Sequence, residues 1–319
     1  MITTSIQAAK TILDSDGVIG FPTETVYGLA ANIFSEKAIK SIFELKNRPT
    51  NNPLIVHIHS IDQLSEIVED VTDNALLLMK EFWPGPLTLI LPKKKTISSL
   101  VTGGKDTVAV RMPNHALALD LLRTVEFPLA APSANPFSSI SPTSAQHVAT
   151  YFGEKVPVIL DGGQCEFGIE STILGFENDK MVLYRKGSIP IESIEKTIGY
   201  IPELKSSNQQ IKAPGMYLRH YAPTTQLRVV ENSDSAIMNI DSTKIGLITL
   251  APKITHSKVC KHVVLSSTGS LEEAAYKLYS TFHLLDQLEL DLIFIEKFPE
   301  NGIGSSLNDR IERASFTNK

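Results

Sequence analysis

The sequence predicts an α/β or α+β protein made of two domains, and three observations support this fold class. Short apolar runs typical of buried strands alternate along the chain with stretches that have the spacing of amphipathic helices. The chain has 319 residues, of which 42% are hydrophobic, so it can bury a sizeable core. A polar, proline-bounded stretch at residues 201–223 separates two such alternating regions and fits neither periodicity.

The first region, assigned to residues 1–200, begins with a helix and a strand. Apolar residues recur at helical spacing from Ile2 to Leu13, Gly17 ends this helix, and a strand follows at residues 18–23. A second helix is expected over residues 35–46, because Ser35 is a good N-cap. The later apolar runs predict strands at residues 53–58, 87–92, 107–113, 128–133, 156–163 and 171–176, and helices at residues 62–82 and 115–124.

The last region, assigned to residues 224–319, has the pattern of a small Rossmann-like domain with a parallel sheet. Buried strands are predicted at residues 244–252, 261–266 and 290–298, and a well-patterned helix at residues 270–288. The dinucleotide fingerprint is missing, because "GIGSSLNDR" has only a G-x-G near the carboxyl end. The phosphate-binding G-x-x-x-x-G-K-[ST] motif is also missing, so ATP, if bound, is bound in another way.

Charge and composition disfavour several classes of protein. The net charge is −5, with 30 Lys and Arg against 35 Asp and Glu, so no basic field covers the whole surface to hold a nucleic acid. The first residues lack the pattern of a signal peptide, and no apolar window is long enough to span a bilayer. Cys165 and Cys260 lie far apart, which argues against a disulfide framework or a structural zinc site. We therefore expect a cytoplasmic protein without a membrane segment.

Polar residues gather where the strands of the first region end. Lys46 and Arg48 follow the second predicted helix, where a cation also simply complements the helix dipole. Hydroxyl, amide and arginine side chains occur at the ends of further strands in "FPTETVYGLAA", "VAVRMP", "APSANPFSSISPTSA", "GIEST" and "YRKG". In open α/β sheets the carboxyl ends of the strands form the ligand-binding edge. A ligand site is therefore expected there.

These motifs resemble a known family. The segments "FPTETVYGLAA", "KNRPTNNPLIVHI", "RMPNHALA", "APSANPFSSISPTSA", "DGG", "GIESTIL" and "YRKGSI" are similar, in order and spacing, to the YrdC-like domain of the threonylcarbamoyl-AMP synthases. This resemblance covers about residues 5–195. The segment "APGMYLRHYAP" resembles the linker of the longer, two-domain members, and "GIGSSLNDRIERAS" resembles their carboxyl-terminal motif. The resemblance implies a twisted-sheet YrdC-like domain followed by a Rossmann-like domain.

The resemblance also implies an activity. Such a synthase joins L-threonine, bicarbonate and ATP into threonylcarbamoyl-AMP and releases pyrophosphate. Mg²⁺ is expected to accompany ATP, although no carboxylate is identifiable as its ligand and no protein metal site is predicted. The product would pass to a tRNA threonylcarbamoyl transferase complex for the threonylcarbamoyladenosine modification, without stable binding of tRNA to this chain.

The resemblance assigns residues to two parts of one site. The nucleotide phosphates would be bound by cations and by hydrogen-bonding groups, namely Lys46, Arg48, Asn52, Thr107, Ser133, Asn135, Ser141 and Arg185. The threonine pocket would be formed by Arg111, which holds the carboxylate, with Thr25, His57, the Ala131 backbone and Ser171 or Thr172, and Tyr27 would shape its wall. Lys46 and Arg48 would position the substrates, and no catalytic residue is named. Arg suits these roles because its planar guanidinium binds carboxylate and phosphate oxygens in pairs.

The residue types alone leave other interpretations open. A lone Arg111 is typical of a surface ion pair, and His57 with His59 on one strand face could suggest a metal. The Ser-rich stretch after Ala131 has the composition of an ordinary turn-rich loop. Glu24 and Glu170 suggest a general base, but hydrogen bonding to backbone amides explains them equally well.

The linker and the carboxyl-terminal motif carry separate hypotheses. Aromatic and cationic residues in "PGMYLRHYAP" favour a lid over a passive tether, and the resemblance would place Tyr221 on the nucleotide. Tyr217 stands where many relatives carry a lysine and receives no role. The carboxyl-terminal motif is expected to pack at a helix start, with Asn308 as a cap.

Two other functions remain as alternatives. An RNA-binding module would need a broad basic patch with stacking aromatic residues, whereas only 7% of residues here are aromatic. A carbamoyltransferase with a related domain would be expected to carry additional modules that have no counterpart in this sequence.

Overall fold

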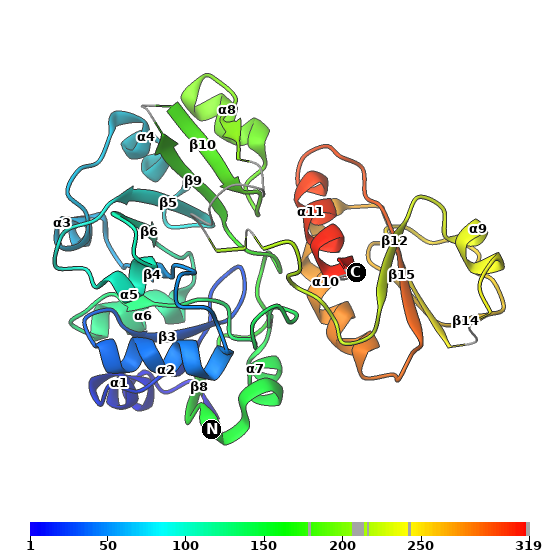
Figure 1. Ribbon diagram of the computed structural model, residues 1–319, viewed down its shortest axis with the longest axis horizontal. Helices are drawn as coiled ribbons and strands as arrows, with labels where there is room; N and C mark the ends of the chain where they lie inside the picture. Colours follow the sequence, from blue (N-terminus) through cyan, green and yellow to red (C-terminus); the bar gives the residue numbers. More distant parts are fainter. Residues whose placement is uncertain (178–179, 206–213, 216, 242–243, 317–319) are drawn as a thin grey trace.

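The computed structural model describes residues 1–177, 180–205, 214–215, 217–241 and 244–316, and has two lobes (Figure 1). The first lobe is built on a large mixed sheet and the second on a small parallel sheet. Part of the predicted linker, residues 206–213 and 216, lies outside the described residues. The predicted division into residues 1–200, 201–223 and 224–319 stays a prediction, and β11 (Glu203–Leu204) extends the first sheet beyond residue 200.

Within the described residues the first sheet has the strand order β1-β8-β2-β3-β7-β4-β6-β5-β9-β10-β11. Its strands are β1 (Ile2–Thr3), β2 (Ile19–Phe21), β3 (Gly28–Asn32), β4 (Ile55–His57), β5 (Leu87–Pro92), β6 (Thr107–Arg111), β7 (Leu129–Ala130), β8 (Val158–Leu160), β9 (Thr172–Glu177), β10 (Lys180–Arg185) and β11. The sheet contains both parallel pairs, such as β4 and β6, and antiparallel pairs, such as β9 and β10. The predicted mixed α/β class is confirmed.

Helices cover both faces of this sheet because successive strand residues point to opposite sides. In β3, Leu29 and Ala31 join one apolar cluster, whereas Ala30 joins another. The first cluster is covered by α2 (Glu36–Lys46), α3 (Leu64–Ile67), α4 (Asp73–Phe82), α5 (Ser99–Thr102), α7 (Ala145–Phe152) and α8 (Ile191–Ile198). The short turns η1 (Ile61–Gln63) and η2 (Gly153–Lys155) contribute no buried residue. The second cluster is covered by α1 (Ile6–Asp14) and α6 (Ala116–Thr124).

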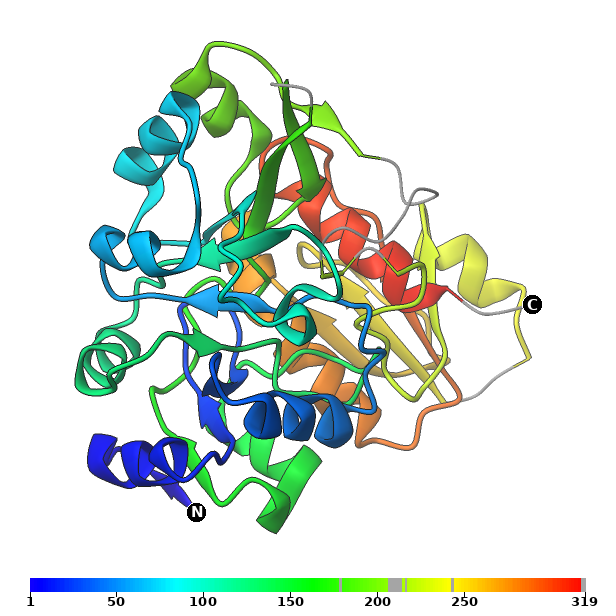
Figure 2. The same ribbon diagram turned by 60° about the vertical axis from the view of Figure 1, so that its left-hand side comes forward.

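The second domain confirms the predicted parallel sheet. Its described strands are β12 (Leu227–Val230), β13 (Ile245–Thr249), β14 (Val259–Val264) and β15 (Leu292–Glu296), in the order β12-β15-β13-β14, and all their pairings are parallel. One face carries α9 (Ser233–Met238). The other carries α10 (Leu271–Asp286) and α11 (Gly304–Ser315), which lie between the second sheet and the first domain (Figures 1 and 2).

Several predicted elements need correction. Ile2 belongs to a strand that pairs with β8 and not to the first helix, because its backbone completes the sheet edge beside Ile159. The single helix predicted over residues 62–82 is broken into η1, α3 and α4, since the chain between them is extended at Val68. Asn308 is not a cap. It lies inside α11, where its buried amide bonds the backbone N–H and carbonyl of Phe298.

The two domains share one apolar interface. Val26, Ile140 and Ile169 of the first domain belong to the same buried cluster as the inner faces of α10 and α11. Each of the three comes from a different loop of the first domain, so the second domain packs against several loops at once. Among the described helices, none is long and apolar enough to cross a bilayer.

Candidate active site

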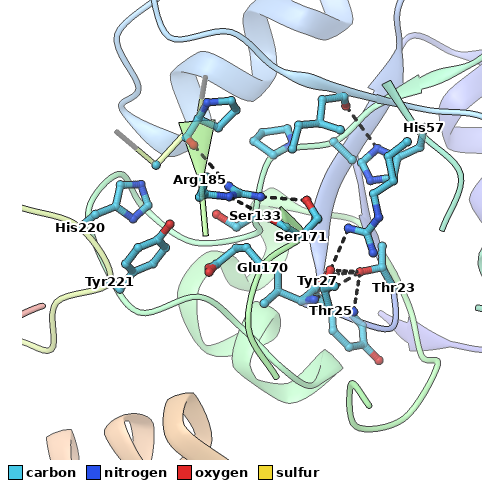
Figure 3. A pocket seen from close by; sticks show the side chains of 18 of the residues that line it. Thr23, Thr25, Tyr27, His57, Ser133, Glu170, Ser171, Arg185, His220 and Tyr221 are labelled. Carbon is cyan, nitrogen blue, oxygen red and sulfur yellow. Dashed lines mark hydrogen bonds between the residues drawn. The ribbon is translucent and has the colours of Figure 1, made fainter. Parts of the chain in front are cut away.

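A recess at the edge of the first sheet brings together side chains from distant parts of the sequence (Figure 3). It is formed by the β2–β3 connection, the segment after α2, the ends of β4, β6 and β10, the loops around β7 and β9, and the linker. The lining residues are Thr23, Thr25, Val26, Tyr27, Gly28, Arg48, Ile55, His57, Arg111, Ala131, Pro132, Ser133, Glu170, Ser171, Arg185, Pro214, Gly215, His220 and Tyr221.

One end of the recess is formed where the parallel strands β4 and β6 finish. Register places His57 directly beside Arg111, so both side chains reach the same edge. Arg111 is 3% exposed, which excludes the surface ion-pair interpretation. Its Nη1 donates to Thr25 Oγ1 at 2.9 Å and its Nε to the Gly85 carbonyl at 3.3 Å. Its Nη2 lies 2.6 Å from Glu24 Oε1, an ion pair without hydrogen-bond geometry.

His57 is a neutral imidazole in this setting. Burial, together with the nearby positive charge of Arg111, lowers the pKa of His57 to about 3. Its Nδ1 lies 3.2 Å from the Ile55 carbonyl, and Phe21 packs against the ring edge to face. A neutral ring at this position can exchange hydrogen bonds with a ligand without adding charge. The described residues contain no group of three or more potential metal ligands, so nothing supports the metal interpretation.

The opposite end of the recess carries two buried arginines. Arg48 donates to the carbonyls of Asn52 and Pro53, at 3.3 and 2.9 Å. Arg185 donates to the carbonyl and hydroxyl of Ser171, at 3.0 and 2.9 Å. Burial lowers the pKa of both guanidinium groups, that of Arg48 to about 9. In each case a neighbouring arginine also disfavours the charged form.

Within the described chain, neither Arg48 nor Arg185 forms an ion pair with a carboxylate. Buried cations without a contacting carboxylate are costly, and Glu170 acts on Arg185 only from beyond ion-pair distance, so an anion entering the recess would relieve this cost. The electrostatics of this end therefore favour a ligand with several negative charges, such as a polyphosphate.

Lys46 is buried and lies behind the recess wall. Its ammonium group donates to the carbonyls of Ser133 and Asn135, each at 2.5 Å. Burial, followed by the like charge of Arg48, holds the pKa of Lys46 well below its usual value. In this structure Lys46 thus fixes the loop that follows β7.

Two linker residues complete the wall beside Arg185 (Figure 3). The His220 Nδ1 atom and the Tyr221 hydroxyl are buried and have no hydrogen-bond partner. Burial, reinforced by several nearby cations, holds the pKa of His220 well below its usual value, so the ring is neutral. Because unpartnered buried polar groups are unfavourable, these two atoms are suited to bind a ligand.

The structure brings most of the predicted site residues together. Ten of them line the recess: Thr25, Tyr27, Arg48, His57, Arg111, Ala131, Ser133, Ser171, Arg185 and Tyr221. Six do not: Lys46, Asn52, Thr107, Asn135, Ser141 and Thr172. Of the alternatives Ser171 and Thr172, only Ser171 faces the recess, because the Thr172 hydroxyl donates to the Ile189 carbonyl. Ala131 uses its N–H for the Ile55 carbonyl, which leaves its own carbonyl for a ligand.

The residues outside the lining differ in their surroundings. Both amide atoms of the buried Asn52 lack partners, as does Asn135 Oδ1, so each has unused hydrogen-bonding capacity. Ser141 donates to Glu170 Oε1 at 2.6 Å. Thr107 lies at the start of β6, and Arg111 at its end.

Sequence reasoning gave no role to His220, Pro214, Gly215 or Thr23, which also line the recess. His220 directly precedes Tyr221, which the resemblance places on the nucleotide, so this adjacency could have identified His220 as a site residue. Pro214 and Gly215 contribute backbone, which carries no recognisable chemical signature.

Comparisons with known proteins cover nearly the whole chain. A family model described as "Telomere recombination" matches residues 11–187, and one described as "Threonylcarbamoyl-AMP synthase, C-terminal domain" matches residues 189–315. The threonylcarbamoyl-AMP synthase of Pyrococcus abyssi is 40% identical over 97% of this chain and 94% of its own. This chain belongs to the threonylcarbamoyl-AMP synthase family. The synthase of Bacillus subtilis is 41% identical over 97% of this chain and 92% of its own.

The fold comparison agrees with this assignment. The crystal structure of the P. abyssi synthase complexed with L-threonine superimposes with a TM-score of 0.91 at 39% identity, over 99% of this chain and 97% of that one. The resemblance seen in the motifs is thereby confirmed, as is the two-domain form of the threonylcarbamoyl-AMP synthases. The chain is a nucleotidyltransferase of this family, whose substrates are ATP, L-threonine and bicarbonate.

Proposed function

We propose that the recess holds the two larger substrates side by side, the nucleotide at the end with Arg48 and Arg185 and threonine at the end with Arg111. The observation that carries this assignment is the distribution of charge. Arg111 already has Glu24 as an ion-pair partner, so the charge at its end of the recess suits no more than one further carboxylate. The other end holds two arginines with neutral partners and matches a triphosphate.

The nucleotide end receives the residues assigned to ATP. Arg48, Arg185, Ser133 and Tyr221 face the recess directly, and His220 joins them. Asn52 and Asn135 bring unused polar atoms, and Lys46 holds the carbonyls of Ser133 and Asn135 in place. Ser141 can contact a phosphate only by exchanging its bond to Glu170. Thr107 remains part of the proposal through the resemblance alone.

The threonine end offers partners for each polar group of the amino acid. Arg111 would bind the carboxylate, the Ala131 carbonyl would accept from the amine, and His57, Thr25 and Ser171 are polar partners for the hydroxyl. Val26 and Tyr27 contribute the nonpolar wall. Valine has no hydroxyl and would leave these polar partners unpaired, so the site should reject it strongly. Serine lacks only one methyl group, so the binding free energy that discriminates against it should be about 1–3 kcal/mol.

The reaction then proceeds in two steps between substrates held in place. The threonine amine and bicarbonate give a carbamate and water. A carbamate oxygen next forms a bond to the α-phosphorus while the bond between that phosphorus and the bridging oxygen of pyrophosphate breaks. Pairing of both anions with fixed cations contributes orientation and charge neutralisation. Neither nearby carboxylate is a free base, because Glu24 pairs with Arg111 and Glu170 with Arg310.

The linker is proposed to close the site. Tyr221 is 1% exposed and its backbone has a φ of 62°, so the chain is held in a left-handed turn against the recess. A covered site would protect the mixed anhydride from hydrolysis. Mg²⁺ would enter on the ATP phosphates and keep water ligands, as the described residues provide no carboxylate cluster for it.

The product is proposed to leave for a separate tRNA threonylcarbamoyl transferase complex. The buried position of the arginines supports this route, because cations inside a recess cannot form an open surface for RNA. The same feature disfavours the RNA-binding alternative.

A pair of substitutions tests the two ends separately. In Arg111→Lys the planar guanidinium is lost, so the KM for threonine should rise at least tenfold while the affinity for ATP stays within about twofold. In Arg185→Lys the KM for ATP should rise at least tenfold, while the affinity for threonine stays within about twofold. Pyrophosphate release is measured against each substrate, with bicarbonate saturating. An equal loss for both substrates in both variants would contradict the division of the recess.

A further inference from the structure

The carboxyl-terminal domain contributes one fully buried cation to the rear of the recess. Arg310 of α11 is 0% exposed, and its guanidinium reaches into the first domain. Its Nε lies 2.7 Å from Glu170 Oε2, and its Nη2 donates to the Lys186 carbonyl at 2.6 Å. Asp309, its neighbour in α11, pairs with Nη1 at 2.6 Å. The Glu170 side chain is 6% exposed and that of Asp309 23%, so the contact to Glu170 is enclosed in the interface, whereas Asp309 lies at its rim.

The partners of Arg310, Glu170 and Lys186, are direct sequence neighbours of two residues that line the recess. Glu170 directly precedes Ser171, and Lys186 directly follows Arg185. Ser171 and Arg185 are the pair joined by two hydrogen bonds at the nucleotide end. One guanidinium group from the second domain thus holds the two chain segments whose adjacent residues, Ser171 and Arg185, line the recess.

Further contacts of the second domain fix the same carboxylate. Tyr279 of α10 donates to Glu170 Oε2 at 3.0 Å, while Ser141 donates to Oε1. Gly168 makes this approach possible, because a Cβ there would lie 2.5 Å from the Ala275 carbonyl of α10. Each oxygen of Glu170 is therefore occupied by a donor, which fits a positioning role and not proton transfer.

Arg310 also contacts the lid residue. Its guanidinium carbon lies 4.9 Å from the centre of the Tyr221 ring, a cation–π distance. The ring of Tyr279 stacks on Tyr221 at 5.8 Å. The Tyr221 hydroxyl, which has no partner, is thereby aimed at the recess by residues of the second domain.

We infer that Arg310 is a positioning residue of the reaction, through which the carboxyl-terminal domain sets Arg185 and Tyr221 for the nucleotide. The inference rests on the proposed assignment of these two residues to ATP. It gives the second domain a defined contribution to the first domain's chemistry. Threonine binding should depend on it much less, since Arg111 and His57 have no contact with Arg310 among those the structure describes, and Ser171 is the one threonine-pocket residue next to Glu170.

The test compares Arg310→Lys in the full-length chain with Arg228→Lys, the same chemical change at an exposed position of the second domain. ATP and L-threonine binding are measured separately by calorimetry, and kcat and KM by pyrophosphate release. Arg310→Lys keeps the charge but loses the forked contacts to Glu170 and Lys186. ATP affinity should fall at least tenfold, with threonine affinity within about twofold of the parent and Arg228→Lys unchanged. Unchanged ATP affinity, or equal losses for ATP and threonine, would overturn the inference.

Tyr279→Phe provides a second measurement if Arg310→Lys unfolds. It removes one donor to Glu170 and leaves every charge in place, so a smaller loss of ATP affinity is expected, again without a loss for threonine. ATP binding equal to the parent would count against the inference. Arg185→Ala separates the assignment of Arg185 to ATP from the positioning role of Arg310. If Arg185→Ala retains ATP affinity, the assignment of the nucleotide end is wrong. If Arg185→Ala loses ATP affinity but Arg310→Lys and Tyr279→Phe do not, Arg310 has no positioning role.

Discussion

At the scale of single residues, the linker packs against the recess wall so closely at Gly215 that a side chain would not fit. Gly215 has a φ of 86°, which strains any residue with a side chain. A Cβ at this position would lie 2.7 Å from the Tyr221 hydroxyl and 2.9 Å from Arg185 Cδ. The linker can pass this close to the cations only because the residue is glycine.

Gly215→Ala should therefore weaken ATP binding at least tenfold, since the new methyl displaces Arg185 or Tyr221. Gly199→Ala is a matched control. Gly199 has a similar φ of 84°, but a Cβ there meets nothing within 4 Å. Both variants carry the same kind of backbone strain, about 1 kcal/mol, and only the first touches the recess. Calorimetric titration with ATP measures the difference. Equal affinities in the two variants would contradict the proposed position of the linker.

At the scale of secondary-structure elements, α2 delivers Lys46 and Arg48 to the site. Its start is set by Ser35, whose hydroxyl accepts from the Ala38 N–H, as the sequence predicts. Its end is set by Asn47, which adopts a left-handed conformation with a φ of 51° and turns the chain toward Arg48. The two signals that bound the helix thus also fix where its cations lie.

Ser35→Ala should lower the free energy of unfolding by about 1 kcal/mol, because one N-terminal backbone N–H loses its acceptor. The KM values should not change, as the far end of α2 remains packed. Ser41→Ala, in the interior of the same helix, should be neutral or slightly stabilising, because alanine has the higher helix propensity. Urea unfolding of the three proteins checks this. A similar loss of stability in both variants would mean that the cap contributes nothing.

At the scale of the whole molecule, the interface between the domains contains a stacked pair of imidazoles. His147 of α7 and His283 of α10 have ring centres 3.9 Å apart. Burial lowers the pKa of both rings, that of His283 to about 4, and the neighbouring His147 disfavours its protonation further. Asp286 acts in the opposite direction, and Tyr151 packs against the His283 ring edge to face. The interface therefore requires both rings to be neutral.

This requirement predicts a pH dependence of stability. The pKa of His283 is lower in the folded protein than in the unfolded chain, so the unfolded chain takes up the proton first as the pH falls. Stability should decrease from about pH 6.5 down to about pH 4, by about 1.4 kcal/mol per pH unit for this group. His283→Gln removes this contribution, so the difference in unfolding free energy between variant and parent should change over that window. A constant difference would show that the pair does not titrate as described.

The sequence alone determined the family, the alternation of strands and helices, and the chemical types in the site, because these depend on local patterns and motifs. It did not reveal Ile2 as part of the sheet, the breaks in the helix predicted over residues 62–82, or the partners of Glu24 and Glu170. Only the tertiary structure decided that Ser171 and not Thr172 faces the recess, and that Arg310 contacts Glu170 across 140 residues of sequence. Pairing between distant segments is selected by burial and by the need to satisfy buried charges, and neither leaves a mark in local sequence.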